Sequence, residues 1–335
     1  MGQAEERGVS RPSELLAGVD VGGTKIAAGL ATREGRVIAS ARIATPASGG
    51  DAVIEAIADL VRRILSDAGV PASDVASLGI AVPAVIDTAR ANVLWAPNIP
   101  GWDKEGTAGS SLPLPHSDKG TPLAAPISHA LGIATSLHYD GHAWVMGEWW
   151  LGAARGARDA ALVAVGTGIG GGLILGGRLH RGRIGVAGAI GWWVTDCAEM
   201  GSGRRETHGQ LESVASGPAI ARAAGRQTAD EALQAARQGD PAAVRAVGEA
   251  AAALGAAVAN LVSLLDPEVV VLAGGVIAGG GDLLLSRVQE IVSREAQPQI
   301  AAGVRIVPAA LGEEGPWLGA ARLAFTDVEA VKGDP

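Results

Sequence analysis

The sequence predicts an α/β protein whose two domains face each other across a cleft. Three observations lead to this fold class. Apolar strand segments alternate with helical segments, which is typical of α/β sheets. A unit of strand, glycine turn and strand occurs twice, at residues 15–39 and 161–182, and internal duplication of this kind organises a fold. The chain of 335 residues is also long for a single hydrophobic core.

The first copy of the unit predicts a turn that binds phosphate. An apolar strand over Leu15–Val21 is followed by Gly22, Gly23 and Thr24, and a second strand resumes over Lys25–Ala31. Because glycine has no side chain, several backbone N–H groups can face one anion, and the threonine adds a hydroxyl. The alternative is an ordinary glycine hairpin.

The second copy repeats the plan. A strand over Leu162–Val165 is followed by Gly166, Thr167 and Gly168; Gly170–Gly172 extend the predicted turn before the next strand. These glycines also match the dinucleotide-binding pattern, but that pattern needs a helix after the turn, and here a strand is expected. Two matched turns favour joint binding of one polyphosphate.

The hydrophobic periodicity predicts further elements within, between and after the two units. The predicted helices are Asp51–Ala68, Ile127–Leu131, Leu211–Ala224, Thr228–Arg237, Pro241–Leu265, Asp282–Glu295 and Pro316–Thr326. The predicted strands are Arg36–Ala41, Ser77–Val82, Leu173–Leu175, Glu268–Leu272 and Val304–Ala309. Residues 103–126 are weakly patterned and read as a lid or insertion.

Two strand ends are candidate ligand sites. Asp140 lies between a predicted strand over Ile133–Leu137 and a predicted helix over Ala143–Leu151, and ligands of open α/β sheets bind beyond such ends. The alternative is a helix cap. Gly274 and Gly275 lie between a strand and a helix, where a nucleotide base could pack; the alternative is a plain turn.

Composition excludes several classes of function. The net charge of −8 argues against a nucleic-acid surface. The N-terminus has no apolar signal segment and no long apolar run predicts a membrane span. The single cysteine, Cys197, allows no internal disulfide, which favours a cytoplasmic location. The spacing of Cys197, His180 and His208 fits no structural zinc site.

Several segments together resemble the ROK family, which contains bacterial sugar kinases and sugar-responsive repressors. The resemblance covers about residues 15–325 and rests on segments 20–25 (DVGGTK), 82–87, 96–102 (APNIPGW), 147–156, 166–172 (GTGIGGG), 211–217 (LESVASG), 266–275 and 312–320. It implies the two-domain actin-like ATPase fold, also called ribonuclease H-like. The smaller N-terminal domain would span 13–131, with a C-terminal helix 316–331 returning to it, and the larger domain 132–315. The short N-terminus favours the kinase branch, and the family makes a homodimer our expectation.

The resemblance also implies roles for individual residues. Asp140 matches the family's catalytic base, and Tyr139 replaces the asparagine that precedes it. Ala84, Asn98 and Glu212 match positions of the sugar pocket. In the predicted phosphate half, Asp20 assists Mg²⁺ and the turn residues with Lys25 hold ATP.

The sugar half departs from the family pattern. Residues 189–192 read Ala-Ile-Gly-Trp where the family has Glu-x-Gly-His, so Trp192 replaces the histidine that also ligates structural zinc. The family's cysteine cluster is missing, and Gln210 occupies the cysteine position of its Gly-Cys-x-Glu segment. These changes make the predicted pocket more apolar, and losing hydroxyl partners implies a changed substrate.

We therefore expect an ATP- and Mg²⁺-dependent kinase acting on a primary hydroxyl of a glucose-like acceptor that is not glucose. By analogy with specialised kinases of antibiotic pathways, the acceptor would be an aminosugar such as kanosamine or a C7-cyclitol such as a valiolone. The alternatives are a catalytically silent sugar or nucleotide sensor, or an ordinary glucokinase or hexosamine kinase.

Overall fold

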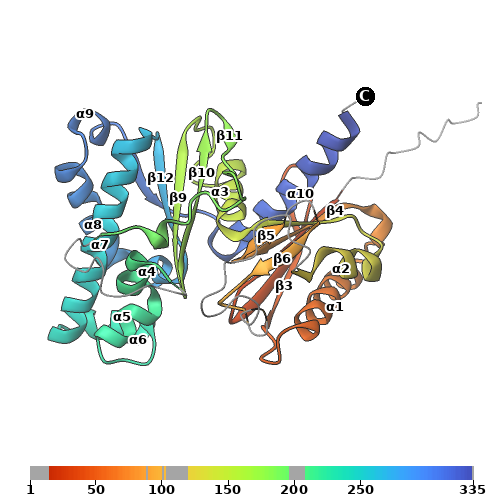
Figure 1. The fold of residues 1–335 in the computed structure, drawn as a ribbon, viewed down its shortest axis with the longest axis horizontal. Coiled ribbons are helices and arrows are strands. Elements are labelled where there is room, and N and C mark those ends of the chain that lie inside the picture. The colour runs from red at the N-terminus through yellow and green to blue at the C-terminus, as the bar shows by residue number, and fades with distance from the viewer. Residues whose placement is uncertain (1–14, 88–89, 100–101, 103–119, 196–207, 334–335) are drawn as a thin grey trace, which may run out of the picture.

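The chain forms two lobes, each built on a five-stranded sheet (Figure 1). The structure, a computed structural model, describes residues 15–87, 90–99, 102, 120–195 and 208–333. Two helices, one packed on each sheet, lie between the sheets. The duplicated unit of the sequence accounts for this arrangement, because each sheet contains one copy of it.

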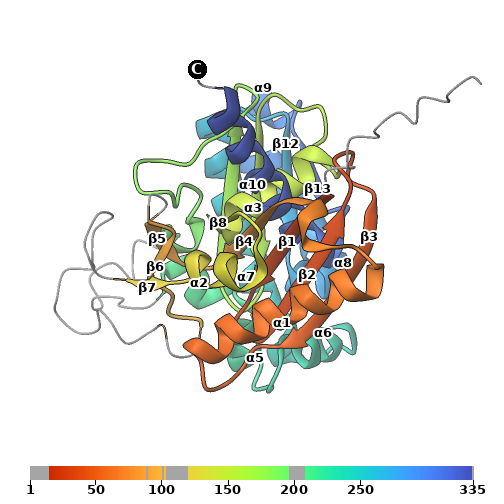
Figure 2. The ribbon, with the colours of Figure 1, turned by 90° about the vertical axis from the view of Figure 1, so that its right-hand side faces the viewer.

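The first sheet has the strand order β3-β2-β1-β4-β8. Its strands are β1 (Leu15–Val21), β2 (Lys25–Ala31), β3 (Val37–Ala44), β4 (Val75–Val82) and β8 (Thr135–Tyr139). β1 pairs antiparallel with β2 and parallel with β4. The helices α1 (Asp51–Ala68) and α2 (Ala124–Leu131) share a core with these strands and cover one face of the sheet (Figure 2).

The second sheet repeats this plan with the order β11-β10-β9-β12-β13. Its strands are β9 (Ala160–Val165), β10 (Ile169–Leu175), β11 (Arg178–Leu179), β12 (Val269–Ala273) and β13 (Arg305–Pro308). β9 pairs antiparallel with β10 and parallel with β12, as β1 does with β2 and β4. The predicted duplication is therefore confirmed at the level of topology.

Helices cover the outer face of the second sheet. They are α4 (Gln210–Ala215), α5 (Gly217–Ala223), α6 (Ala229–Arg237), α7 (Pro241–Leu265), α8 (Gly275–Glu295) and α9 (Pro298–Ala301). The central helix is α7, which begins where the sequence predicts, because Asp240 caps it by accepting from Ala243 N at 2.9 Å. By length and composition α7 could cross a membrane, but its apolar residues form much of the core of this lobe.

The two inner helices are α3 (Asp140–Trp150), on the second sheet, and α10 (Gly315–Gly333), on the first. α10 lies directly on the strands. A Cβ placed at Gly79 of β4 would come within 1.9 Å of the Ala320 carbonyl oxygen. β8 pairs with β4 and so belongs to the first sheet. The chain therefore passes to the second sheet after Tyr139, later than the predicted domain boundary between residues 131 and 132.

Short elements complete the fold. They are the small antiparallel sheet of β5 (Val85–Asp87), β6 (Asn92–Trp95) and β7 (Thr121–Pro122), and the 3-10 turns η1 (Ala72–Asp74), η2 (Ile190–Trp192) and η4 (Gly312–Glu314). Strand β7 and the start of α2 fall within the predicted insertion 103–126, of which residues 103–119 lie outside the described residues.

Three element predictions are wrong. Gly170–Gly172 belong to β10 and not to a turn, because they pair with residues of β9. α8 begins at Gly275, seven residues before the predicted start, and runs through three consecutive glycines. The helix expected over Leu211–Ala224 is two helices, since Ser216 has an extended backbone between them.

Candidate active site in the cleft between the lobes

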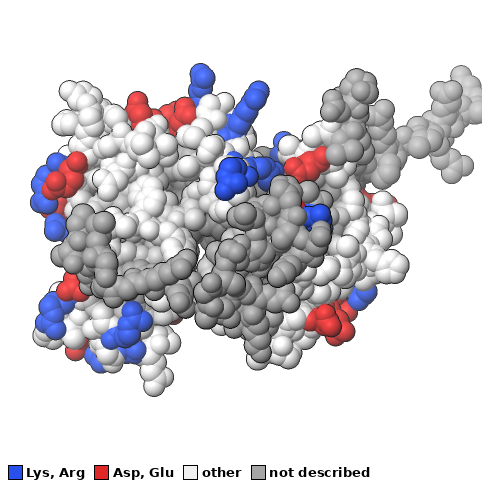
Figure 3. Space-filling model, in the orientation of Figure 1, with Lys and Arg blue, Asp and Glu red and all other residues white. Residues whose placement is uncertain are grey.

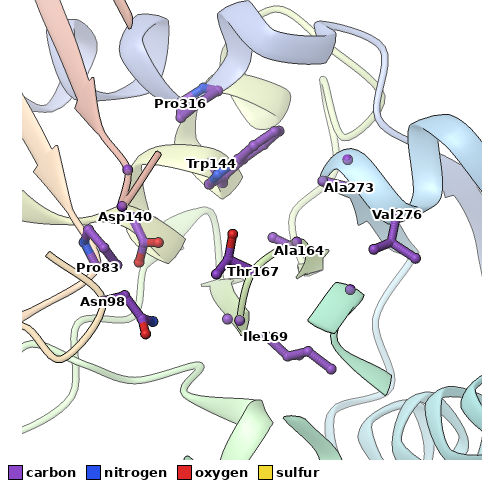
Figure 4. Close-up of a pocket in the computed structure, with 18 of the residues that line it drawn as sticks. Pro83, Asn98, Asp140, Trp144, Ala164, Thr167, Ile169, Ala273, Val276 and Pro316 are labelled. Carbon is purple, nitrogen blue, oxygen red and sulfur yellow. The ribbon is translucent and has the colours of Figure 1, made fainter. Parts of the chain in front are cut away.

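A cavity of about 790 Å³ lies between the lobes and receives residues from both sheets. All of the site residues named from the sequence line it: Asp20, Gly22, Gly23, Thr24, Lys25, Ala84, Asn98, Tyr139, Asp140, Gly166, Thr167, Gly168, Trp192, Glu212, Gly274 and Gly275. Figure 4 shows Asn98, Asp140 and Thr167 around this space. The fold thus brings together residues up to 255 positions apart in the chain, from Asp20 to Gly275.

The turn between β1 and β2 is held closed by backbone and side-chain bonds. Gly22 N donates to Lys25 O at 2.9 Å, and the Thr45 hydroxyl donates to Gly22 O at 2.6 Å. Gly23 lies against the loop after β6, where a Cβ would come within 2.3 Å of Asn98 O. Glycine is required at this contact because any side chain would push the loop away.

The turn between β9 and β10 faces the cavity from the other lobe. Gly166 N donates to Gly168 O at 2.9 Å, and Gly217 N donates to Gly166 O at 2.8 Å, which ties the turn to the start of α5. Thr167 stands at the tip of this tight turn and points into the cavity (Figure 4). The two predicted turns therefore lie on opposite lobes and line one space.

Asp140 is the first residue of α3, at the carboxyl end of β8. Its Oδ1 accepts from Gly141 N at 2.7 Å, and the N-cap position belongs to Tyr139. Burial raises the pKa of Asp140 to about 6; the Gly141 N–H opposes this rise and the charge of Glu212 adds to it. A carboxylate with a pKa near neutrality suits a general base.

Asp20 is the penultimate residue of β1, just before the first glycine turn. Burial raises its pKa to about 7, the Asp140 carboxylate adds to the rise, and Lys25 opposes it. Two carboxylates that repel each other in a cleft are hard oxygen ligands that a divalent cation would stabilise. One or two carboxylates with phosphate oxygens are the usual protein environment of Mg²⁺, so the residues present fit that ion.

Glu212, in α4, belongs to the opposite wall. Its Oε2 accepts from Ile169 N at 2.7 Å, and a Cβ at Gly168 would come within 2.8 Å of the same oxygen. Glycine at 168 therefore leaves room for the carboxylate. Burial raises the pKa of Glu212. The Asn98 amide nitrogen is also close to this turn, 3.5 Å from a Cβ placed at Gly168.

Tyr139 is buried and packs edge-on against the ring of His142, with 5.2 Å between the ring centroids. Burial and the Arg181 charge lower the pKa of His142 to about 4, so its ring is neutral, and Nε2 lies 3.1 Å from the Ala187 carbonyl oxygen. This contact fixes the segment before η2. At the end of that segment Trp192 remains 45% exposed within the cleft.

Gly274 and Gly275 form the turn from β12 into α8. Gly274 has a φ of 91°, which glycine adopts without strain, and a Cβ there would come within 2.3 Å of Val165 O. The next two residues of α8, the apolar Val276 and Ile277, also line the cavity. A flat aromatic base fits such a surface.

Several lining residues were missed from the sequence, among them Trp95, Trp144, Thr228, Glu313 and Pro316. Trp144 and Pro316 stand together above Asp140 in Figure 4. The sequence carries little signal for Trp144 and Pro316, since they lie in the interior of α3 and in the first turn of α10. Among the described residues, no three histidine, cysteine or acidic side chains gather at a metal site. Cys197 lies outside that part of the chain, so the prediction of no structural zinc stays a prediction.

Comparison with known proteins adds independent information. The sequence model of the ROK family matches residues 16–327. The glucokinase of Streptomyces coelicolor is 31% identical over 340 residues, which cover 92% of this chain and 97% of that protein.

Two solved structures are similar over nearly their whole length. The ROK hexokinase of Thermus thermophilus has a TM-score of 0.75 and 32% identity, covering 94% of this chain and 99% of that one. A ROK family glucokinase of Streptomyces griseus, solved with glucose and AMPPNP, also has a TM-score of 0.75 and 32% identity, covering 93% and 99%.

Proposed function

Because this chain belongs to the ROK family, we propose that it is an ATP- and Mg²⁺-dependent kinase of a glucose-like acceptor other than glucose. Its fold is the two-domain actin-like ATPase fold. One observation carries the proposal: a glycine turn from each sheet and the carboxylate of Asp140 line the same cavity.

The proposed reaction is transfer of the terminal phosphoryl group of ATP to a primary hydroxyl. The turns with Thr24 and Thr167 hold the phosphates through backbone N–H groups and hydroxyls. Asp20 would hold Mg²⁺ together with phosphate oxygens, and the ion when bound offsets their negative charge. Asp140 accepts the proton of the attacking hydroxyl as the oxygen–phosphorus bond forms and ADP leaves.

The apolar part of the cavity lining supports an acceptor other than glucose. Val186, Ala189, Trp192 and Trp95 line the cavity, and none of these side chains pairs with a ring hydroxyl as a carboxylate would. An apolar wall fits a ring that differs from glucose around its edge, such as an aminosugar like kanosamine or a C7-cyclitol like a valiolone. A place in antibiotic biosynthesis would follow from such an acceptor.

A panel of acceptors tests the proposal. ADP release would be measured by a coupled assay with glucose, N-acetylated and free aminosugars, and cyclitols, each over a range of concentrations. We expect kcat/KM for one aminosugar or cyclitol to exceed that for glucose by at least about tenfold, the discrimination that one changed hydroxyl contact supplies. Glucose as the best acceptor would contradict the acceptor class and leave an ordinary glucokinase.

The same panel of acceptors distinguishes a kinase from a catalytically silent sensor. The altered residues of the sugar half favour a sensor, whereas both turns and Asp140 favour a kinase. A sensor would bind nucleotide or sugar and release no acceptor-dependent ADP with any member of the panel.

A further inference from the structure

The junction between β13 and α10 connects the lobes and forms part of the wall of the cleft. Its lining residues are Pro308, Ala309, Gly312, Glu313 and Pro316. The chain leaves the second sheet at Pro308 and enters α10, which lies on the first sheet. A side chain on this junction can therefore respond to events in either lobe.

A buried carboxylate fixes the backbone of the junction. Glu148 of α3 is fully buried, and its Oε1 accepts from Leu311 N at 2.9 Å. Its Oε2 accepts from Ala310 N at 3.1 Å and from Ala153 N at 2.7 Å. Gly312, with a φ of 53°, then turns the chain sharply. The position of the next residue, Glu313, follows from these fixed neighbours.

Glu313 reaches from this junction to the first sheet with both carboxylate oxygens. Oε1 lies 2.7 Å from Nζ of Lys25 in β2, and Oε2 lies 2.7 Å from a guanidinium nitrogen of Arg42 in β3. Each oxygen thus has its own cationic partner. Loss of one partner leaves the other contact in place.

Lys25 directly follows the first glycine turn and lines the cavity. Its ammonium group acts on the Asp20 carboxylate, as does Glu313 with the opposite sign. The Lys25 and Glu313 side chains are 44% and 59% exposed, and ion pairs of this exposure are weak because water screens them. Phosphate oxygens placed at the turn would compete for the same ammonium group.

We propose that Lys25 exchanges its partner when the nucleotide binds: it leaves Glu313 and binds the phosphates. Before the nucleotide binds, Glu313 holds Lys25; when the phosphates arrive, Lys25 turns to them and Arg42 keeps Glu313. The exchange rests on the proposed binding of ATP at the two turns. The exchange makes Glu313 a positioning residue that limits the affinity for the nucleotide. It also links binding in the cleft to release of the contact between Lys25 and Glu313.

Nucleotide binding by variants that each remove one charge tests the exchange. The dissociation constant of Mg–AMPPNP would be measured by calorimetry on the full chain at low salt, with thermal unfolding as a check of folding. Glu313→Gln should bind roughly two- to fivefold more tightly, because the competitor for Lys25 is removed. Arg42→Gln should bind more weakly, because Glu313 then has Lys25 as its remaining partner. Glu314→Gln, which removes the same charge one residue away from the cavity lining, should bind as the wild type does.

A double variant separates exchange from a general loss of negative charge. In a Lys25→Met background, Glu313→Gln should no longer tighten binding, whereas a purely general effect would persist there. Unchanged or weaker binding by a folded Glu313→Gln overturns the exchange alone. Failure of the wild-type chain to bind Mg–AMPPNP overturns both the exchange and the proposed nucleotide site.

Discussion

At the scale of single residues, the cleft concentrates charge that the fold does not fully compensate. Asp20 and Asp140 carry pKa values of about 7 and about 6 because they are buried and close to other carboxylates. A carboxyl group whose pKa is raised by folding stabilises the protein below its unfolded pKa of about 4 and loses that contribution as the pH rises through the folded value. At neutral pH both groups therefore reduce stability, which is typical of groups kept for a reaction.

Asp140→Asn should separate the two effects. Removing the base should lower turnover by at least about 10²-fold, the usual weight of general-base catalysis. The nucleotide-free variant should also melt at a higher temperature than the wild type at pH 7.5, because a buried charge is lost. Turnover in the acceptor assay and calorimetric melting would be measured on the same preparation. Near-normal turnover would remove Asp140 from the role of base.

The pH dependence of turnover should report the same carboxylate. Since the base must be ionised, kcat/KM should fall about tenfold per pH unit below about pH 6. A pH profile from 5 to 8.5 at saturating Mg–ATP checks this, with thermal unfolding to exclude loss of the folded state. Residual turnover of Asp140→Asn should lack this acidic limb; a limb shared by both proteins would point to a different group.

At the scale of elements, glycines decide how closely helices approach strands. A Cβ at Gly172 of β10 would come within 2.3 Å of Gly141 O in α3, and one at Gly79 would meet α10. These glycines serve close packing and not turns. This is why Gly170–Gly172 were misread from the sequence: a run of glycine has the same local signature in both settings, and only the neighbouring helix distinguishes them.

Gly79→Ala tests this packing role. The new methyl group must displace α10, at a cost of about 1–3 kcal/mol or more. Gly248→Ala is the matched control, because a Cβ at Gly248 in α7 meets nothing within 4 Å and alanine favours a helix by about 0.5–1 kcal/mol. Denaturant unfolding should show opposite signs for the two variants. Similar stabilities would mean that the approach of α10 is looser than the structure describes.

Glu148→Ala tests the anchor between α3 and the junction before α10. It leaves three backbone N–H groups without their acceptor, and we expect a loss of about 3 kcal/mol. Glu249→Ala, at an exposed position of α7, should change the free energy of unfolding by less than about 0.5 kcal/mol. Glu148→Gln keeps one acceptor oxygen and should fall between them in urea unfolding. Equal stability of the two alanine variants would contradict the anchor.

The sequence predicted the elements whose signals are local. Helices α1 and α7 have the predicted bounds, because their apolar residues recur with helical spacing and Gly69 and Asp240 mark an end and a start. The residues of the two glycine turns line one cavity because two copies of one unit place their turns at equivalent positions. Glu148 and Glu313 could not be predicted, since their contacts join segments more than 160 and 280 residues apart.

At the scale of the whole molecule, two lobes share one cavity and are joined through α3, α10 and the junction before α10. Lysine, arginine, aspartate and glutamate side chains of the described residues appear on both lobes in the surface view (Figure 3). In the cleft, both glycine turns and Asp140 line one cavity.

We expect the two lobes to close when nucleotide and acceptor bind. Each turn comes from a different sheet, so one triphosphate must draw both lobes together, and closure also excludes water that would hydrolyse ATP. Small-angle scattering should show a smaller radius of gyration with Mg–AMPPNP and the preferred acceptor than with either alone. Asp140→Asn should close in the same way, because it removes the base and keeps both turns. An unchanged radius with both ligands bound would mean that the lobes already hold their reactive spacing, and the exclusion of water would then depend on the acceptor alone.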